Sequence, residues 1–101
     1  MANAEKLEKQ LAEKVKKYRS LTGKALEKIS IYAENGSKDY AVAEDFLEMA
    51  RNYFSDGKHF EEKGELILAL AAYSYAHAWL DAGVRAKILD GKGDSRLFTL
   101  P

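Results

Sequence analysis

The sequence predicts an all-α protein, a three-helix antiparallel up-and-down bundle with a short C-terminal tail that packs back on it. Three observations support this prediction. Apolar residues recur at steps of three and four over two long segments, a third segment is apolar on almost every side, and Gly-containing breaks separate the three. With 101 residues, 47% of them hydrophobic, the chain has room for one modest core, so we expect a single domain over residues 1–101.

The first helix is expected over residues 3–34. The Asn35-Gly36-Ser37 sequence should end it, because Asn or Gly tolerates the left-handed residue after a helix and Ser37 is a favourable N-cap for the next helix. The opposite side of the first helix is rich in lysine and glutamate. Its apolar, core-facing positions are Leu7, Leu11, Val15, Tyr18, Thr22, Ala25, Ile29 and Tyr32.

The second helix is expected over residues 38–62 and the third over residues 65–89, with Gly64 as the stop between them. The third is apolar almost all round, which predicts a central position with both other helices as neighbours. Small side chains let another helix approach closely, so two seams of them predict two close partners. The seams are Ala69, Ala72, Ala76 and Gly83 on one side, and Ala71, Ala78 and Ala82 on another.

The remaining residues, 90–101, form the tail. A polar turn at its start is followed by Leu97, Phe98 and Leu100, and we expect these apolar side chains to cover one end of the bundle; the alternative is a disordered tail.

The charge balance removes the usual electrostatic argument for a nucleic-acid or membrane partner. The chain has 16 basic and 16 acidic residues and a net charge of zero. It has no cysteine, which excludes disulfides and thiolate metal sites. No signal-like or membrane-spanning apolar run is present, so we expect a cytoplasmic protein without a membrane partner.

The best candidate for a binding site lies on the third helix. His77, Asp81 and Arg85 are spaced four residues apart, so they stack on one face, with Tyr73 one turn earlier. Asp81 could orient and charge-stabilise His77 as a general base or a metal ligand. The competing interpretation, which we favour, is a row of polar side chains that solvates one strip of a buried helix. A single His lacks the three protein ligands typical of catalytic zinc, so no metal and no catalytic residue is assigned.

Arg51 and His59 form a second pairing, on the second helix. An Arg and a His a few residues apart on one helix occur in some helical ribonucleases, but here seven residues separate the two, and we expect them to point to different faces.

The segment YFSDGKHFEEKGELILALAAYSYAHAWLDAG, residues 53–83, resembles domain of unknown function family 357. The shared pattern is an aromatic-Asp stretch with a following Phe, a Gly-acidic turn, and a helix that ends Tyr-Ala-x-x-Trp-Leu-Asp-Ala-Gly. The matching residues are Phe54, Asp56, Phe60, Gly64, Glu65, Tyr75, Ala76, Trp79, Leu80, Asp81, Ala82 and Gly83. The resemblance implies an archaeal source and a small three-helix bundle, and it carries no activity.

The sequence therefore favours a non-enzymatic helical interaction or scaffold module without a cofactor, whose partner is another protein or a second copy in a homodimer. One alternative is RNA or nucleotide binding through the basic face of the first helix, assisted by Arg85 or Arg96. A fainter alternative is an enzyme or metal site at His77 and Asp81.

Overall fold

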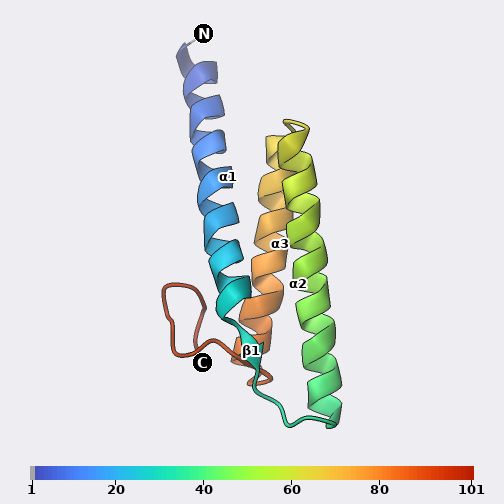
Figure 1. Ribbon diagram of the computed structural model, residues 1–101. Helices are drawn as coiled ribbons and strands as arrows, with labels where there is room; N and C mark the ends of the chain where they lie inside the picture. Colours follow the sequence, from blue (N-terminus) through green and yellow to red (C-terminus); the bar gives the residue numbers. More distant parts are fainter. Residues whose placement is uncertain (1) are drawn as a thin grey trace.

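The computed structural model describes residues 2–101, and three long helices dominate it (Figure 1). The helices run antiparallel to their sequence neighbours, so the predicted all-α up-and-down bundle is confirmed. A short antiparallel strand pairing, which the sequence did not predict, links the segment after the first helix to the segment after the third. The elements are α1 (Ala2–Lys28), β1 (Ser30–Ile31), α2 (Lys38–Glu62), α3 (Leu66–Arg85) and β2 (Leu89–Asp90).

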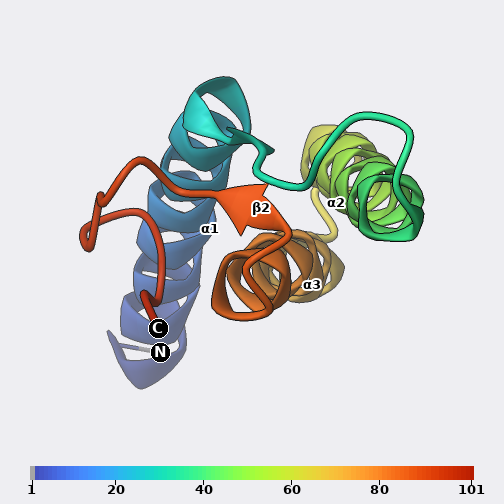
Figure 2. The ribbon, with the colours of Figure 1, turned by 90° about the horizontal axis from the view of Figure 1, so that it is seen from below.

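Helix α3 is central, as its apolar composition predicts. It packs along both α2 and α1, whereas α1 and α2 contact each other much less (Figure 2). The first predicted seam of small residues is buried in these contacts. The expectation for the second seam was wrong, because α1 and α2 cover other sides of α3 and leave the side with this seam open. The residues of this second seam are all exposed: Ala71, Ala78 and Ala82.

Both predicted helix boundaries around α2 are confirmed. The Ser37 hydroxyl accepts a hydrogen bond from the Tyr40 amide at 3.1 Å, which caps the start of α2. After the end of α2, Gly64 takes a φ of +74°, and the Glu65 amide donates to the Phe60 carbonyl at 2.9 Å. This is the Schellman arrangement, in which glycine avoids the steric penalty of a left-handed residue. The chain can thus reverse within three residues.

Helix α1 ends at Lys28 rather than at residue 34. Beyond it the backbone turns to pair Ser30–Ile31 with Leu89–Asp90, and the Tyr32 amide donates to the Ile88 carbonyl at 2.9 Å. The tertiary pairing overrides the helical period that continues through this segment. Tyr32, expected to face the core, has 69% of its surface exposed.

Helix α3 likewise ends at Arg85 rather than at residue 89. Lys87 adopts a left-handed conformation with a φ of +62°, and the Ile88 amide donates to the Gly83 carbonyl at 3.1 Å. A second Schellman turn therefore ends this helix, with a lysine where glycine is usual. Because lysine is an ordinary helix former, the sequence contains no local stop signal at this position.

The tail closes the lower end of the bundle, as predicted. Phe98 is buried with 3% of its surface exposed, in a cluster that includes Leu80 and Leu89, and Leu97 and Leu100 pack against that cluster. At the opposite end, α1 extends past the turn between α2 and α3 (Figure 1). Leu7, near the start of α1, is 64% exposed, so the expected core-facing stripe of α1 is only partly buried.

At Gly57, α2 packs directly against the Tyr73 ring of α3. A Cβ atom there would lie 2.5 Å from a carbon of the buried Tyr73 ring, whereas a Cβ at Gly23 would meet only Phe54, at 3.4 Å. We predict that Gly57→Ala lowers the free energy of unfolding by about 1–2 kcal/mol, because overpacking outweighs the gain in helix propensity. The matched change Gly23→Ala should be neutral or stabilising. Urea unfolding of both variants tests this, and equal effects at the two glycines would contradict it.

Candidate functional site

The polar strip of α3 holds the tail. His77 Nε2 donates to the Leu97 carbonyl at 2.6 Å, and Asp81 Oδ1 accepts from the Thr99 amide at 2.9 Å. One turn further on, Arg85 Nη1 donates to the Leu100 carbonyl at 2.9 Å. The three residues that the sequence placed on one face do lie in a row, and each one satisfies a backbone group of the tail.

Both ring nitrogens of His77 are engaged. A carbonyl oxygen can only accept, so Nε2 carries a proton, and in the neutral ring Nδ1 then accepts from the Thr22 hydroxyl at 3.1 Å. Asp81 does not orient the ring as the sequence suggested, because its Oδ1 lies 3.8 Å from His77 Nε2. Thr22 and Leu97 orient the ring instead. In this arrangement His77 has no free lone pair with which to take a proton or bind a metal.

Tyr73, the fourth candidate, does not belong to this row. Its side chain is fully buried between the helices, against Gly57, Val15 and Ala69. Although it lies one turn before His77, its ring turns into the α2–α3 contact because the missing side chain of Gly57 leaves room for it. Tyr73 therefore acts in the core rather than at the polar strip.

A polar network around Tyr73 connects all three helices. The Tyr73 hydroxyl donates to Glu61 Oε1 at 2.8 Å, and Glu61 Oε2 forms an ion pair with Arg19 of α1. Burial, followed by the hydrogen bond to Glu61, raises the pKa of Tyr73 well above its ordinary value. No pattern in the sequence indicates the roles of Arg19 and Glu61, since both are charged residues on largely charged helix faces.

Thr22 was also missed, although a signal for it existed. It is a polar residue in the apolar stripe of α1, and it is completely buried. A buried hydroxyl needs a hydrogen-bond partner, so this polar residue among apolar ones could have been identified as a hydrogen-bonding position.

Asp94 organises the turn that leads into the tail. Its carboxylate accepts from Lys28 Nζ at 2.8 Å and from the backbone amides of Arg96 and Leu97 at 3.0 and 3.3 Å. The Lys28 hydrogen bond, supported by the Arg96 amide and the charges of Lys28 and Arg96, lowers the pKa of Asp94 to about 2 against the opposing effect of desolvation. Asp94 thus fastens the tail to the end of α1.

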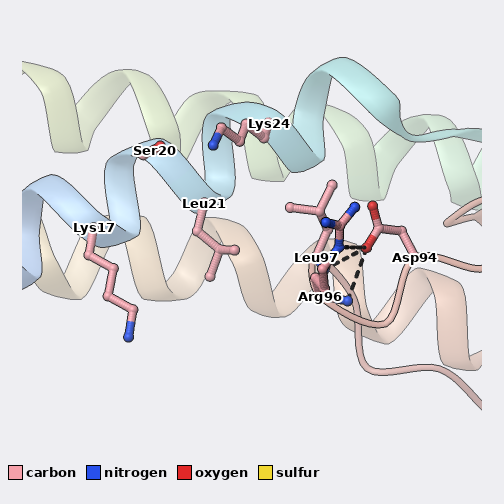
Figure 3. Close-up of a pocket in the computed structure, with 7 residues that line it drawn as sticks. All are labelled: Lys17, Ser20, Leu21, Lys24, Asp94, Arg96 and Leu97. Carbon is pink, nitrogen blue, oxygen red and sulfur yellow. Dashed lines mark hydrogen bonds and ion pairs between the residues drawn. The ribbon is translucent and has the colours of Figure 1, made fainter.

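A cavity of about 410 Å³ lies between α1 and this turn. Figure 3 shows its α1 residues arrayed along the helix and the tail turn at one end of the array. Three cationic side chains line the cavity, and one carboxylate, that of Asp94, lies among them. The lining consists of Lys17, Ser20, Leu21, Lys24, Asp94, Arg96 and Leu97.

Arg51 and His59 were expected on different faces of α2, and this expectation was wrong. Both line one shallow hollow together with Lys58 and Glu62. The two positions are about 80° apart on the helix, which is close enough for long side chains to border the same depression.

Residues 2–101 contain neither a cluster of side chains that could hold a metal nor a helix that could cross a membrane. No group of three or more His, Asp or Glu side chains in this range is arranged to hold a metal ion. No helix in the same range combines the length and the apolar character needed to cross a bilayer.

The fold and its polar contacts define a small helical bundle closed by a clamped tail. A family model described as "Protein of unknown function (DUF357)" matches residues 17–89. The match covers more than half of the chain, so the chain belongs to this family, as its motif resemblance predicted. Comparisons with curated proteins and with solved structures gave no match.

We predict that His77→Ala lowers the free energy of unfolding by about 1–3 kcal/mol, because it leaves the buried Thr22 hydroxyl without a partner and releases the Leu97 carbonyl. His59→Ala is the matched control, since His59 is exposed and its removal should cost within about 0.5 kcal/mol. Urea unfolding measures both changes. A His77 variant as stable as the His59 variant would show that the hydrogen bonds of His77 to Thr22 and Leu97 contribute nothing to the stability.

Asp94 makes the stability of the bundle depend on pH. Its pKa in the folded protein, about 2, is below the ordinary value of about 4. The charged carboxylate therefore stabilises the fold fully above pH 4, and this contribution is lost as the pH falls from about 4 to about 2. We predict that Asp94→Asn unfolds at a lower temperature than the parent protein at pH 7, and that the difference shrinks across this window. A difference that stayed constant from pH 7 to pH 2 would contradict the assignment.

Proposed function

We propose that the protein is a non-enzymatic interaction module that pairs with a second copy of itself through the exposed side of α3. The observation that carries the proposal is an uncharged apolar stripe on this side. Its members are spaced three and four residues apart, so they form one continuous line along the helix: Leu68, Ala71, Tyr75, Ala78 and Ala82.

This stripe lies open in the folded chain. Leu68 is 49% exposed and Tyr75 is 60% exposed, although Tyr75 stacks on Tyr53 of α2 with the ring centroids 5.3 Å apart. In the end-on view of Figure 2, α1 and α2 lie on the other sides of α3. A helix that is apolar all round is typical of a helix covered on all sides, so the open side of α3 favours a further partner.

The shape of the stripe favours a second copy as that partner. Leu68 and Ala82 each lie seven residues from Tyr75, and Ala71 and Ala78 lie four and three residues from it. If two α3 helices pack antiparallel about Tyr75, the large Leu68 of each copy meets the small Ala82 of the other. The alanines beside Tyr75 let the two backbones approach closely. A two-fold interface needs this kind of self-complementary surface.

The open end of the bundle adds apolar surface next to the stripe. Ile67 is 73% exposed, and with Leu66 and Leu68 it lines a groove against Leu11 of α1. This groove continues the stripe toward the overhang of α1, so one interface could cover both.

The fainter alternative, a catalytic or metal site at His77 and Asp81, would require the tail to leave. Both side chains bond to tail atoms, and the second nitrogen of His77 bonds to Thr22. The alternative of RNA binding along the whole basic face of α1 is also weakened. Arg19 and Lys28 already form ion pairs with Glu61 and Asp94, which interrupts that face.

We predict that Ala78→Glu weakens self-association while the monomer stays folded. Ala78 is exposed in the single chain, so the glutamate is tolerated there, but pairing would bury its charge without a partner. Sedimentation equilibrium should give twice the chain mass of 11.3 kDa for the parent protein. The dissociation constant measured for the variant should be higher by at least about tenfold.

Ala41→Glu is the control, because Ala41 is also an exposed helical alanine but lies on α2. It should associate as the parent protein does. A parent protein that stays monomeric at millimolar concentration would overturn the proposal, and so would equal weakening by the two variants.

A further inference from the structure

The cavity between α1 and the tail turn is lined by cationic side chains that are largely exposed to solvent. Lys17 and Lys24 are exposed and, among the described residues, neither forms an ion pair. The side chain of Arg96 is 89% exposed and approaches Asp94 Oδ1 only at 3.5 Å through Nε. These three cations therefore remain available to a ligand.

The one carboxylate in the cavity is already neutralised. The Asp94 carboxylate accepts a hydrogen bond from the Lys28 ammonium at 2.8 Å and two more from backbone amides. Its side chain is only 5% exposed. Its charge is thus compensated within the fold, and it holds Arg96 beside the cavity rather than repelling an incoming anion. The local balance around the opening is positive although the whole chain is neutral.

The arrangement of the cations points to a ligand longer than a single phosphate. Lys17 and Lys24 lie two helical turns apart, about 10 Å along α1, and therefore project from the same face. Arg96 enters from the tail turn at the Asp94 end of the cavity (Figure 3). Ser20 adds a hydroxyl donor between the two lysines, and Leu21 and Leu97 supply an apolar floor.

We propose that this cavity binds a chain of linked phosphates, as carried by a nucleoside di- or triphosphate or by inorganic polyphosphate. Lys17, Lys24 and Arg96 contact successive phosphate groups, and Ser20 donates to a phosphate oxygen. The tail forms one wall, so the site exists only while the clamp on α3 holds the tail in place. This proposal is independent of self-association through α3, because the cavity lies on the α1 side of the bundle.

The test is calorimetric titration of the full chain at low salt with ATP, inorganic triphosphate and orthophosphate as probes. ATP and triphosphate should bind with one site per chain, and orthophosphate should bind at least about tenfold more weakly, because it reaches fewer of the cations. Equal affinity for ATP and triphosphate would identify the phosphate chain as the whole ligand. Tighter binding of ATP would identify a nucleotide seated on Leu21 and Leu97. Absence of saturable binding by either probe overturns the proposal.

Matched variants separate a site from general attraction. The triple change Lys17→Gln, Lys24→Gln and Arg96→Gln should weaken ATP and triphosphate binding about tenfold or more, because exposed ion contacts contribute modestly and add up. The control removes the same charge elsewhere by changing Lys9, Lys38 and Lys63 to Gln, all exposed and without ion pairs among the described residues. It should bind as the parent protein does. Equal weakening in both triple variants overturns the proposal.

Discussion

The buried phenol of Tyr73 is the constraint on which the bundle depends. A ring of this size fits between α2 and α3 only because Gly57 has no side chain, and a buried hydroxyl must find an acceptor. Glu61 supplies that acceptor, and Arg19 compensates the charge of Glu61. One apolar contact and one polar network therefore fix the register of all three helices. A slide of α2 by one turn would break both, and a slide of α1 would break the ion pair of Arg19 with Glu61.

The general fold could be predicted from the sequence because it rests on local patterns. The period of the apolar residues, the Ser37 cap and the Gly64 stop are properties of short segments, and each acts in the structure as expected. The ends of α1 and α3 could not be predicted in the same way. They are set by the pairing of Ser30–Ile31 with Leu89–Asp90 and by a left-handed Lys87, and both depend on residues far apart in the chain.

In the candidate site, too, the local features could be predicted and the long-range contacts could not. Helical spacing correctly places His77, Asp81 and Arg85 in one row, because spacing along a helix is local. The contacts of this row are long-range, because its partners are Thr22 of α1 and the backbone of the tail. Spacing alone also grouped Tyr73 with this row, and only the position of Gly57 on another helix explains why the ring turns inward. Two ion pairs, Arg19 with Glu61 and Lys28 with Asp94, join α1 to the rest of the chain.

The clamped tail has a consequence for the order in which the chain can fold. The contacts of Lys28 with Asp94 and of Thr22 with His77 join residues 66 and 55 positions apart. During synthesis α2 and α3 can pair as a local hairpin, but the end of α1 remains incompletely covered until residues beyond Leu97 have left the ribosome. Closing such distant contacts is slow relative to forming the hairpin. Helix α1, although it is made before α2 and α3, is therefore completed after them.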